Sequence, residues 1–173
     1  MANPLVELGQ YGQSPWLDNI SRGLIASGQL RALIDDDGLK GVTSNPAIFE
    51  KSITGSTDYD TAIEQLAAQN KTAMDIYESL VMEDIQSAAD VLRSVYEATN
   101  GRDGFVSLEV SPYLADDTEG TIEEGRRLWQ AVDRNNVMIK VPATEAGIPA
   151  VRQLISEGLN INVTLMFSLA VYE

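Results

Sequence analysis

Apolar residues recur every three or four positions in two stretches before residue 40, which is the spacing of one face of a helix. The first stretch ends near Gly28 and the second follows it, so the pattern predicts two short helices broken at that glycine. The apolar positions are Leu17, Ile20, Leu24, Ile25, Leu30, Leu33 and Ile34. Residues 1–40 are therefore predicted to form a helical lead-in that carries Asp18.

Four later segments read as β-strands, each followed by a helical pattern. They lie at residues 41–43, 105–110, 137–142 and 161–167, and a weakly supported fifth strand lies near residues 80–82. Strands separated by helices at intervals of roughly 25–35 residues are typical of a parallel α/β fold, because parallel neighbours need a crossover connection. Asn45 and Pro46 follow the first of these strands and predict the cap and first turn of a helix.

The fold expected from this alternation is a TIM (β/α)8 barrel that stops after about five strands. A complete barrel of this kind takes about 250 residues, and the chain has 173. We expect a single partial domain over residues 1–173, with βα units over residues 41–173. Residues 168–173 are expected to open another helix, which indicates the N-terminal part of a longer barrel.

The amino-acid composition excludes several kinds of binding partner and catalytic chemistry. The chain has 26 Asp and Glu against 12 Lys and Arg, a net charge of -14 that disfavours nucleic acid and anionic membranes as partners. It has no Cys and no His, which excludes thiol nucleophiles, Cys/His zinc sites and imidazole acid–base chemistry. No stretch reaches the roughly 20 apolar residues of a membrane span. These features predict a soluble, cytoplasmic protein, and the sequence has neither a calcium-binding loop pattern nor a nucleotide-binding glycine motif.

Side chains on a strand alternate between two faces, and here one face of each predicted strand is apolar while the other is polar. If helices cover the apolar side, the polar side chains point into the barrel near the strand ends where barrel enzymes keep their sites. These residues are Thr43, Asn45, Ser107, Glu109, Lys140, Asn162 and Thr164. The alternative is a sheet with one solvated face, although parallel sheets are generally covered on both faces.

Lys140 has two plausible uses in such a barrel: a structural ion pair with Glu109, or a nucleophile toward a carbonyl group. An amine attacks only when neutral, and lysine has a reference pKa of about 10.4. Burial favours the neutral amine, whereas an adjacent carboxylate favours the charged form. The prediction is therefore that Glu109 does not pair directly with the resting amine, and acts through a water molecule or in its protonated form.

Four segments at successive strand ends together resemble the transaldolase family. They are GVTSNPAIF at 41–49, SLEV at 107–110, MIKVPAT at 138–144 and NINVTLMF at 160–167. The resemblance implies a class I aldolase-type barrel of the pentose phosphate pathway, which moves a dihydroxyacetone unit through a lysine Schiff base without a cofactor. The implied donors are fructose 6-phosphate and sedoheptulose 7-phosphate, and the implied acceptors are erythrose 4-phosphate and glyceraldehyde 3-phosphate.

The resemblance also implies a role for each matched residue. The catalytic matches are Lys140 as Schiff-base lysine, Glu109 as acid–base carboxylate, Thr164 as the hydroxyl that holds the catalytic water, and Asp18 as the carboxylate that moves the proton of the hydroxyl beside the cleaved bond. The matches for binding the dihydroxyacetone unit are Asn45 and Asn162, with Thr43 nearby.

The phosphate-binding arginine and the sixth-strand serine of the family fall beyond residue 173. The 173 residues alone are therefore expected to have little or no transaldolase activity, and a C-terminal remainder of the barrel is the expected partner. That remainder could be a half-barrel alone or one fused to an isomerase domain. Two alternatives stay open: a class I aldolase that releases free dihydroxyacetone, and a non-catalytic partial chain in which Lys140 is purely structural.

Overall fold

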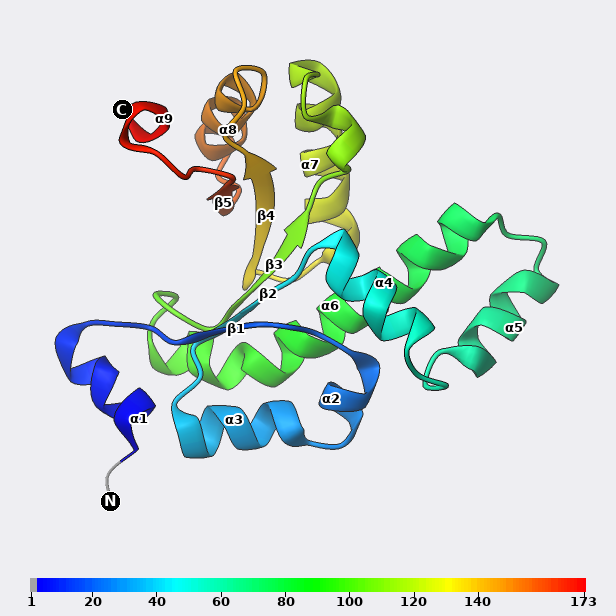
Figure 1. Ribbon diagram of the computed structural model, residues 1–173, viewed down its shortest axis with the longest axis horizontal. Helices are drawn as coiled ribbons and strands as arrows, with labels where there is room; N and C mark the ends of the chain where they lie inside the picture. The colour runs from blue at the N-terminus through cyan, green and yellow to red at the C-terminus, as the bar shows by residue number, and fades with distance from the viewer. Residues whose placement is uncertain (1–2) are drawn as a thin grey trace. The chain divides into compact units, whose positions relative to one another are not determined.

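Strands and helices alternate through residues 3–173, which are the residues that the computed structural model describes (Figure 1). They fall into two units, one that runs to Val106 and one from Ser107 to Glu173. The boundary lies inside strand β3 (Phe105–Glu109). Among the residues that are described, none of the helices has both the length and the apolar character that crossing a bilayer requires.

The first unit begins with two strands interleaved with short helices. Its elements are α1 (Pro4–Leu8), the 3-10 turn η1 (Gly9–Tyr11), β1 (Trp16–Asp18), α2 (Arg22–Ala26), α3 (Gln29–Asp37), β2 (Gly41–Thr43), α4 (Pro46–Thr54), α5 (Asp60–Ala68) and α6 (Ala73–Ala98). Strands β1 and β2 are parallel, with Asp18 opposite Thr43 at their ends. The start of β3 follows β2 in the strand order.

Local sequence signals explain where the helices of this unit begin. The Asn45 side chain accepts a hydrogen bond from the N–H of Ile48 and Pro46 takes the first position of α4, which confirms the predicted cap. A reciprocal pair of hydrogen bonds between Thr72 and Asp75 starts α6. The long helix α6 buries an apolar stripe, and α2, α3 and α5 pack against it (Figure 1).

The second unit continues the βα alternation with longer strands. After β3 come the 3-10 turn η2 (Pro112–Leu114), α7 (Thr118–Val132), β4 (Val137–Pro142), α8 (Gly147–Ser156), β5 (Ile161–Thr164) and α9 (Leu169–Tyr172). The strand order is β3-β4-β5, and β4 and β5 are parallel. Helices α7 and α8 pack on each other and on β4, whose residues Val137, Ile139 and Val141 are fully buried. The apolar face predicted for this strand is confirmed.

Two details of the predicted strand set were wrong. Residues 80–82 lie inside α6, because Leu80 and Val81 belong to the helical stripe that this helix buries. Conversely, residues 16–18 form β1, so the segment 1–40 is not wholly helical and Asp18 ends a strand. A strand of three residues is too short to show a period of two, and Leu17 happened to fit the helical spacing of the residues after it.

Strand β5 is also shorter than the predicted 161–167. Leu165 has a φ of 61°, a left-handed conformation that takes the chain out of the strand directly after Thr164. Leu165, Phe167 and Leu169 are exposed. The prediction of a strand that runs through residue 167 was therefore wrong, and the apolar residues Leu165 and Phe167 lie outside it.

An ion pair joins α7 to the end of α8. The Arg126 guanidinium donates two hydrogen bonds to Glu157, one of them from Nε at 2.8 Å. This pairing, with a further hydrogen bond from Gln153, lowers the pKa of Glu157 to about 2. A carboxyl group whose pKa is depressed in the folded state stabilises the fold above its ordinary pKa, and the contribution is lost as the pH falls through about 2.

The Glu157→Gln variant tests this pH dependence. Because both partners are partly exposed, it is expected to lower Tm by roughly 1–2 °C at pH 7 and to have little effect near pH 2. Thermal unfolding followed by circular dichroism at the two pH values measures the difference. An equal loss of Tm at both would contradict the assignment.

Candidate active site

Lys140 and Glu109 lie side by side on the polar face of the second unit. The Nζ of Lys140 is 3.2 Å from Oε2 of Glu109, and the two side chains are only 10% and 17% exposed. Their strands are adjacent, since the N–H of Val110 donates to the carbonyl of Lys140 at 3.1 Å. The amine of Lys140 and the carboxylate of Glu109 therefore form a direct ion pair.

The direct contact overturns the prediction that Glu109 and the resting Lys140 amine do not touch. Two opposite charges that are mostly removed from water each carry a large desolvation cost, and direct pairing offsets much of it. The prediction treated the ion pair and the nucleophile as competing uses of Lys140.

Asn162 and Ser107 form a second polar pair, which crosses β4. The Nδ2 of Asn162 on β5 donates to Oγ of Ser107 on β3 at 3.0 Å, and Ser107 is fully buried. Asn162 is also the register partner of Lys140. The polar face of β3, β4 and β5 therefore gathers an amine, a carboxylate, an amide and a hydroxyl, as the alternation of residues predicted.

Thr164 lies two residues beyond Asn162 on β5 and is the register partner of Pro142. It is half-buried and shares the face of Asn162, because residues two apart on a strand point the same way. The loops that follow β3 and β4 are tied together here. The Thr144 hydroxyl donates to the carbonyl of Ala115 at 2.6 Å, and the Thr118 hydroxyl donates to that of Ala146 at 2.7 Å.

The other three expected site residues belong to the first unit. Asp18 and Thr43 are register partners at the ends of β1 and β2, and Asp18 is exposed. The amide oxygen of Asn45 accepts the capping hydrogen bond of α4 at 2.9 Å, so its Nδ2 is the group left to donate to a ligand. The structure thus brings Asp18 and Thr43 together, and separately Lys140, Glu109 and Asn162.

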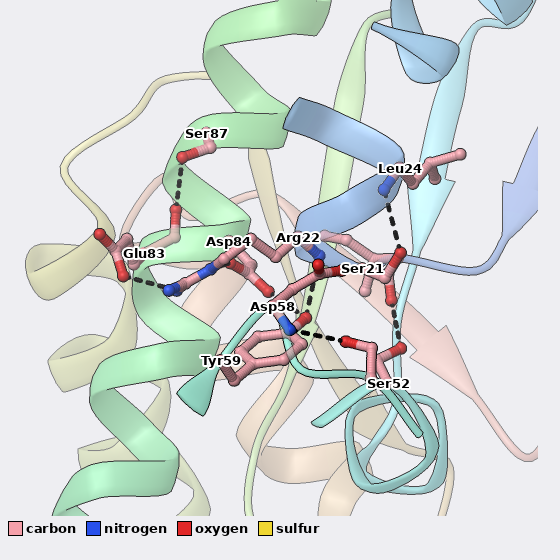
Figure 2. Close-up of polar contacts among 11 residues, drawn as sticks. Ser21, Arg22, Leu24, Ser52, Asp58, Tyr59, Glu83, Asp84 and Ser87 are labelled. Carbon is pink, nitrogen blue, oxygen red and sulfur yellow. Dashed lines mark hydrogen bonds and ion pairs between the residues drawn. The ribbon is translucent and has the colours of Figure 1, made fainter. Parts of the chain in front are cut away.

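The sequence interpretation missed a polar network in the first unit that involves Arg22, Tyr59 and Asp84 (Figure 2). Asp84 and Tyr59 are buried, and burial raises the pKa of both side chains, most strongly that of the Tyr59 phenol. The available signal was Asp84 itself, an acid on the apolar stripe of α6 between Leu80 and Ala88. A carboxylate at such a position needs buried donors.

Comparison with known proteins shows the family of this chain. A family described as Transaldolase/Fructose-6-phosphate aldolase matches residues 15–173. The chain belongs to the transaldolase/fructose-6-phosphate aldolase family. The α/β class and the barrel-type fold expected from the alternation of strands and helices are thereby confirmed.

The most similar relatives include several transaldolases of bacteria. "Transaldolase 2" of Nostoc punctiforme is 53% identical over 170 residues, which cover 98% of this chain and 45% of the relative. "Transaldolase" of Trichodesmium erythraeum is 51% identical over 172 residues, 99% of this chain and 45% of the relative. "Transaldolase" of Neisseria gonorrhoeae is 48% identical over 166 residues, which cover 96% of this chain and 47% of the relative. The chain spans about half the length of these members of the transaldolase/fructose-6-phosphate aldolase family.

Proposed function

We propose that this chain carries the Schiff-base chemistry of a transaldolase, which transfers a dihydroxyacetone unit between sugar phosphates. The observation that supports this most directly is the contact of 3.2 Å between the amine of Lys140 and the carboxylate of Glu109. Imine formation with a ketose requires a lysine that is largely removed from solvent and has a proton acceptor beside it. Membership of the family supports the same chemistry.

The first step joins Lys140 to the ketose. After its proton passes to Glu109, Nζ attacks the ketose carbonyl carbon and a carbinolamine forms. Glu109 returns a proton to the hydroxyl of this intermediate, which leaves as water while the nitrogen lone pair completes the protonated imine. The proposal assigns to Thr164 the task of holding that water, because its hydroxyl both donates and accepts hydrogen bonds.

The second step breaks and remakes a carbon–carbon bond. Asp18 takes the proton of the hydroxyl beside that bond, an aldehyde phosphate leaves, and the bonding electrons enter the imine to form a neutral enamine. The enamine then adds to the acceptor aldehyde, Asp18 returns the proton, and hydrolysis frees the new ketose. The amides of Asn45 and Asn162, with Thr43, hold the hydroxyls of the three-carbon unit meanwhile.

The proposed donors are fructose 6-phosphate and sedoheptulose 7-phosphate, and the acceptors are glyceraldehyde 3-phosphate and erythrose 4-phosphate. A net charge of -14 repels these anions, so a local cationic site for the phosphate is needed. We assign that site to a C-terminal remainder of the barrel, and expect the 173 residues alone to be almost inactive. A cytoplasmic location, where such substrates occur, belongs to the same proposal.

A second candidate is a fructose-6-phosphate aldolase, because the description of the matching family includes that activity. The same imine on Lys140 would then be hydrolysed after cleavage, so that free dihydroxyacetone accumulates. Product analysis with and without an acceptor aldehyde separates the two activities. A transaldolase forms a new ketose phosphate only with the acceptor, and an aldolase releases dihydroxyacetone without it.

Borohydride reduction in the presence of fructose 6-phosphate tests the proposed function. Reduction converts the imine into a stable secondary amine, and we expect mass spectrometry of the complete polypeptide that contains this chain to find the adduct on Lys140. The matched control is Lys51, a lysine on α4 at the surface of the first unit, which should stay unmodified. An intact, folded polypeptide with no adduct on Lys140 would overturn the proposal in favour of a non-catalytic role.

A further inference from the structure

The buried network around Arg22 begins four residues after Asp18. Strand β1 ends at Asp18, and the chain then passes through Asn19 to Ser21 before α2 starts at Arg22. The Ser21 side chain caps α2 by accepting from the N–H of Leu24 at 3.2 Å. The direction in which the chain leaves Asp18 therefore depends on what holds this short connection.

Two hydrogen bonds hold the backbone of the connection. The Ser52 hydroxyl of α4 donates to the carbonyl of Ile20 at 2.8 Å, and the side chain of Ile20 is fully buried. The hydroxyl of Tyr59 accepts from the N–H of Arg22 at 2.9 Å and donates to Oδ2 of Asp84 at 2.7 Å. Tyr59 thus links the backbone after Asp18 to the middle of α6.

The side chain of Arg22 makes the same link a second time (Figure 2). Its Nε donates to Oδ1 of Asp84 at 3.1 Å, a second guanidinium nitrogen contacts Glu83, and the guanidinium carbon lies 4.9 Å from the centre of the Tyr59 ring. Both carboxylate oxygens of Asp84 are used, one by the phenol and one by the guanidinium. A charge-assisted network with this many contacts is rigid and costly to rearrange.

We infer that Tyr59 is a positioning residue for Asp18. With Arg22 and Asp84 it fixes the backbone that follows Asp18, and so determines the direction in which the Asp18 carboxylate points during proton transfer. The inference rests on the proposed function, in which Asp18 moves a proton during carbon–carbon bond cleavage. Tyr59 is fully buried, and its hydroxyl holds the backbone that follows Asp18 by accepting a hydrogen bond from the N–H of Arg22. A displacement of about 1 Å can lower the rate contributed by a catalytic group by up to roughly 100-fold.

The test is Tyr59→Phe in the complete polypeptide, with imine formation and bond cleavage measured separately. The expected result is that release of the aldehyde phosphate from fructose 6-phosphate slows about 10- to 100-fold. Borohydride trapping on Lys140 stays within about twofold of the parent protein, because forming the imine does not use Asp18. Amide hydrogen exchange at Arg22 should also accelerate, since its N–H loses its acceptor.

Tyr11→Phe is the matched control, because Tyr11 belongs to the same unit and its side chain is 79% exposed. It should leave trapping and release unchanged. Equal losses of trapping and release in Tyr59→Phe would show a merely structural role and overturn the inference. So would release at the parent rate.

Two further variants keep the outcome decisive. Asp18→Asn is measured in parallel. If this variant still cleaves the carbon–carbon bond, the proposed role of Asp18 fails. If it loses cleavage while Tyr59→Phe retains it, only the inference about Tyr59 fails. Should Tyr59→Phe not fold, Ser52→Ala removes the milder hydrogen bond to the carbonyl of Ile20. It is expected to slow aldehyde release about threefold with trapping preserved, and no change would overturn the inference.

Discussion

Replacing Lys140 with arginine is expected, from its proposed Schiff-base role, to abolish borohydride-trapped adducts and to lower the proposed transfer activity roughly 10⁴-fold or more. A guanidinium keeps the positive charge beside Glu109 but stays protonated, so it cannot attack a carbonyl carbon. The contact that the amine makes with Glu109 at 3.2 Å can be taken over by the longer side chain. Folding should therefore survive while the chemistry is lost.

Lys140→Met separates the structural from the chemical contribution. It also forms no imine, but it leaves the mostly buried Glu109 without this cationic neighbour, which should cost about 1–3 kcal/mol of stability. Urea denaturation of both variants, beside the trapping assay, measures the two effects. Residual turnover in Lys140→Arg above a few parts in ten thousand would mean that the covalent intermediate forms elsewhere.

The second large effect is expected at Gly104, which leads into β3. Its φ is 85°, and a Cβ placed there would lie 2.3 Å from the backbone nitrogen of Tyr96 and 2.7 Å from its Cα. Helix backbone cannot yield as a flexible side chain can. Gly104→Ala is therefore expected to destabilise the fold by about 3–5 kcal/mol, from a strained φ and from steric overlap together.

Gly28→Ala is the matched control for Gly104→Ala. Gly28 has a φ of 80°, but a Cβ there would meet no atom within 4 Å. It should lose only the conformational part, about 1–2 kcal/mol. Urea midpoints of the two variants give the difference directly. Equal losses would show that the α6 backbone moves aside at Gly104, contrary to the expectation.

The parts of the fold that the sequence predicted are those in which one periodicity persists. Residues 105–109 and 137–142 alternate long enough to show a period of two, and both are strands. Residues 16–18 could not be recognised, because three residues hold little more than one alternation. Leu165 was assigned to a strand because its apolar character fitted, whereas its left-handed φ depends on the local path of the backbone.

In the candidate site, too, some features were predictable from the sequence and others were not. The residue types and their strand positions predicted a shared polar face for Lys140, Glu109 and Asn162, and these residues lie together. The direct contact between amine and carboxylate was not predictable, because the sign of the net free energy of a buried ion pair depends on how much water reaches the two groups. The roles of all the expected site residues stay predictions: Lys140, Glu109, Asp18, Thr164, Asn45, Asn162 and Thr43.

The hydrogen bond from Asn162 to Ser107 joins positions that are 55 residues apart in the sequence. A substitution at either position removes this hydrogen bond, so the effect of a change at position 162 depends on which residue occupies position 107. Mutant libraries that include position 162 should therefore vary the two codons jointly. One-at-a-time scanning would discard pairs that work only in combination.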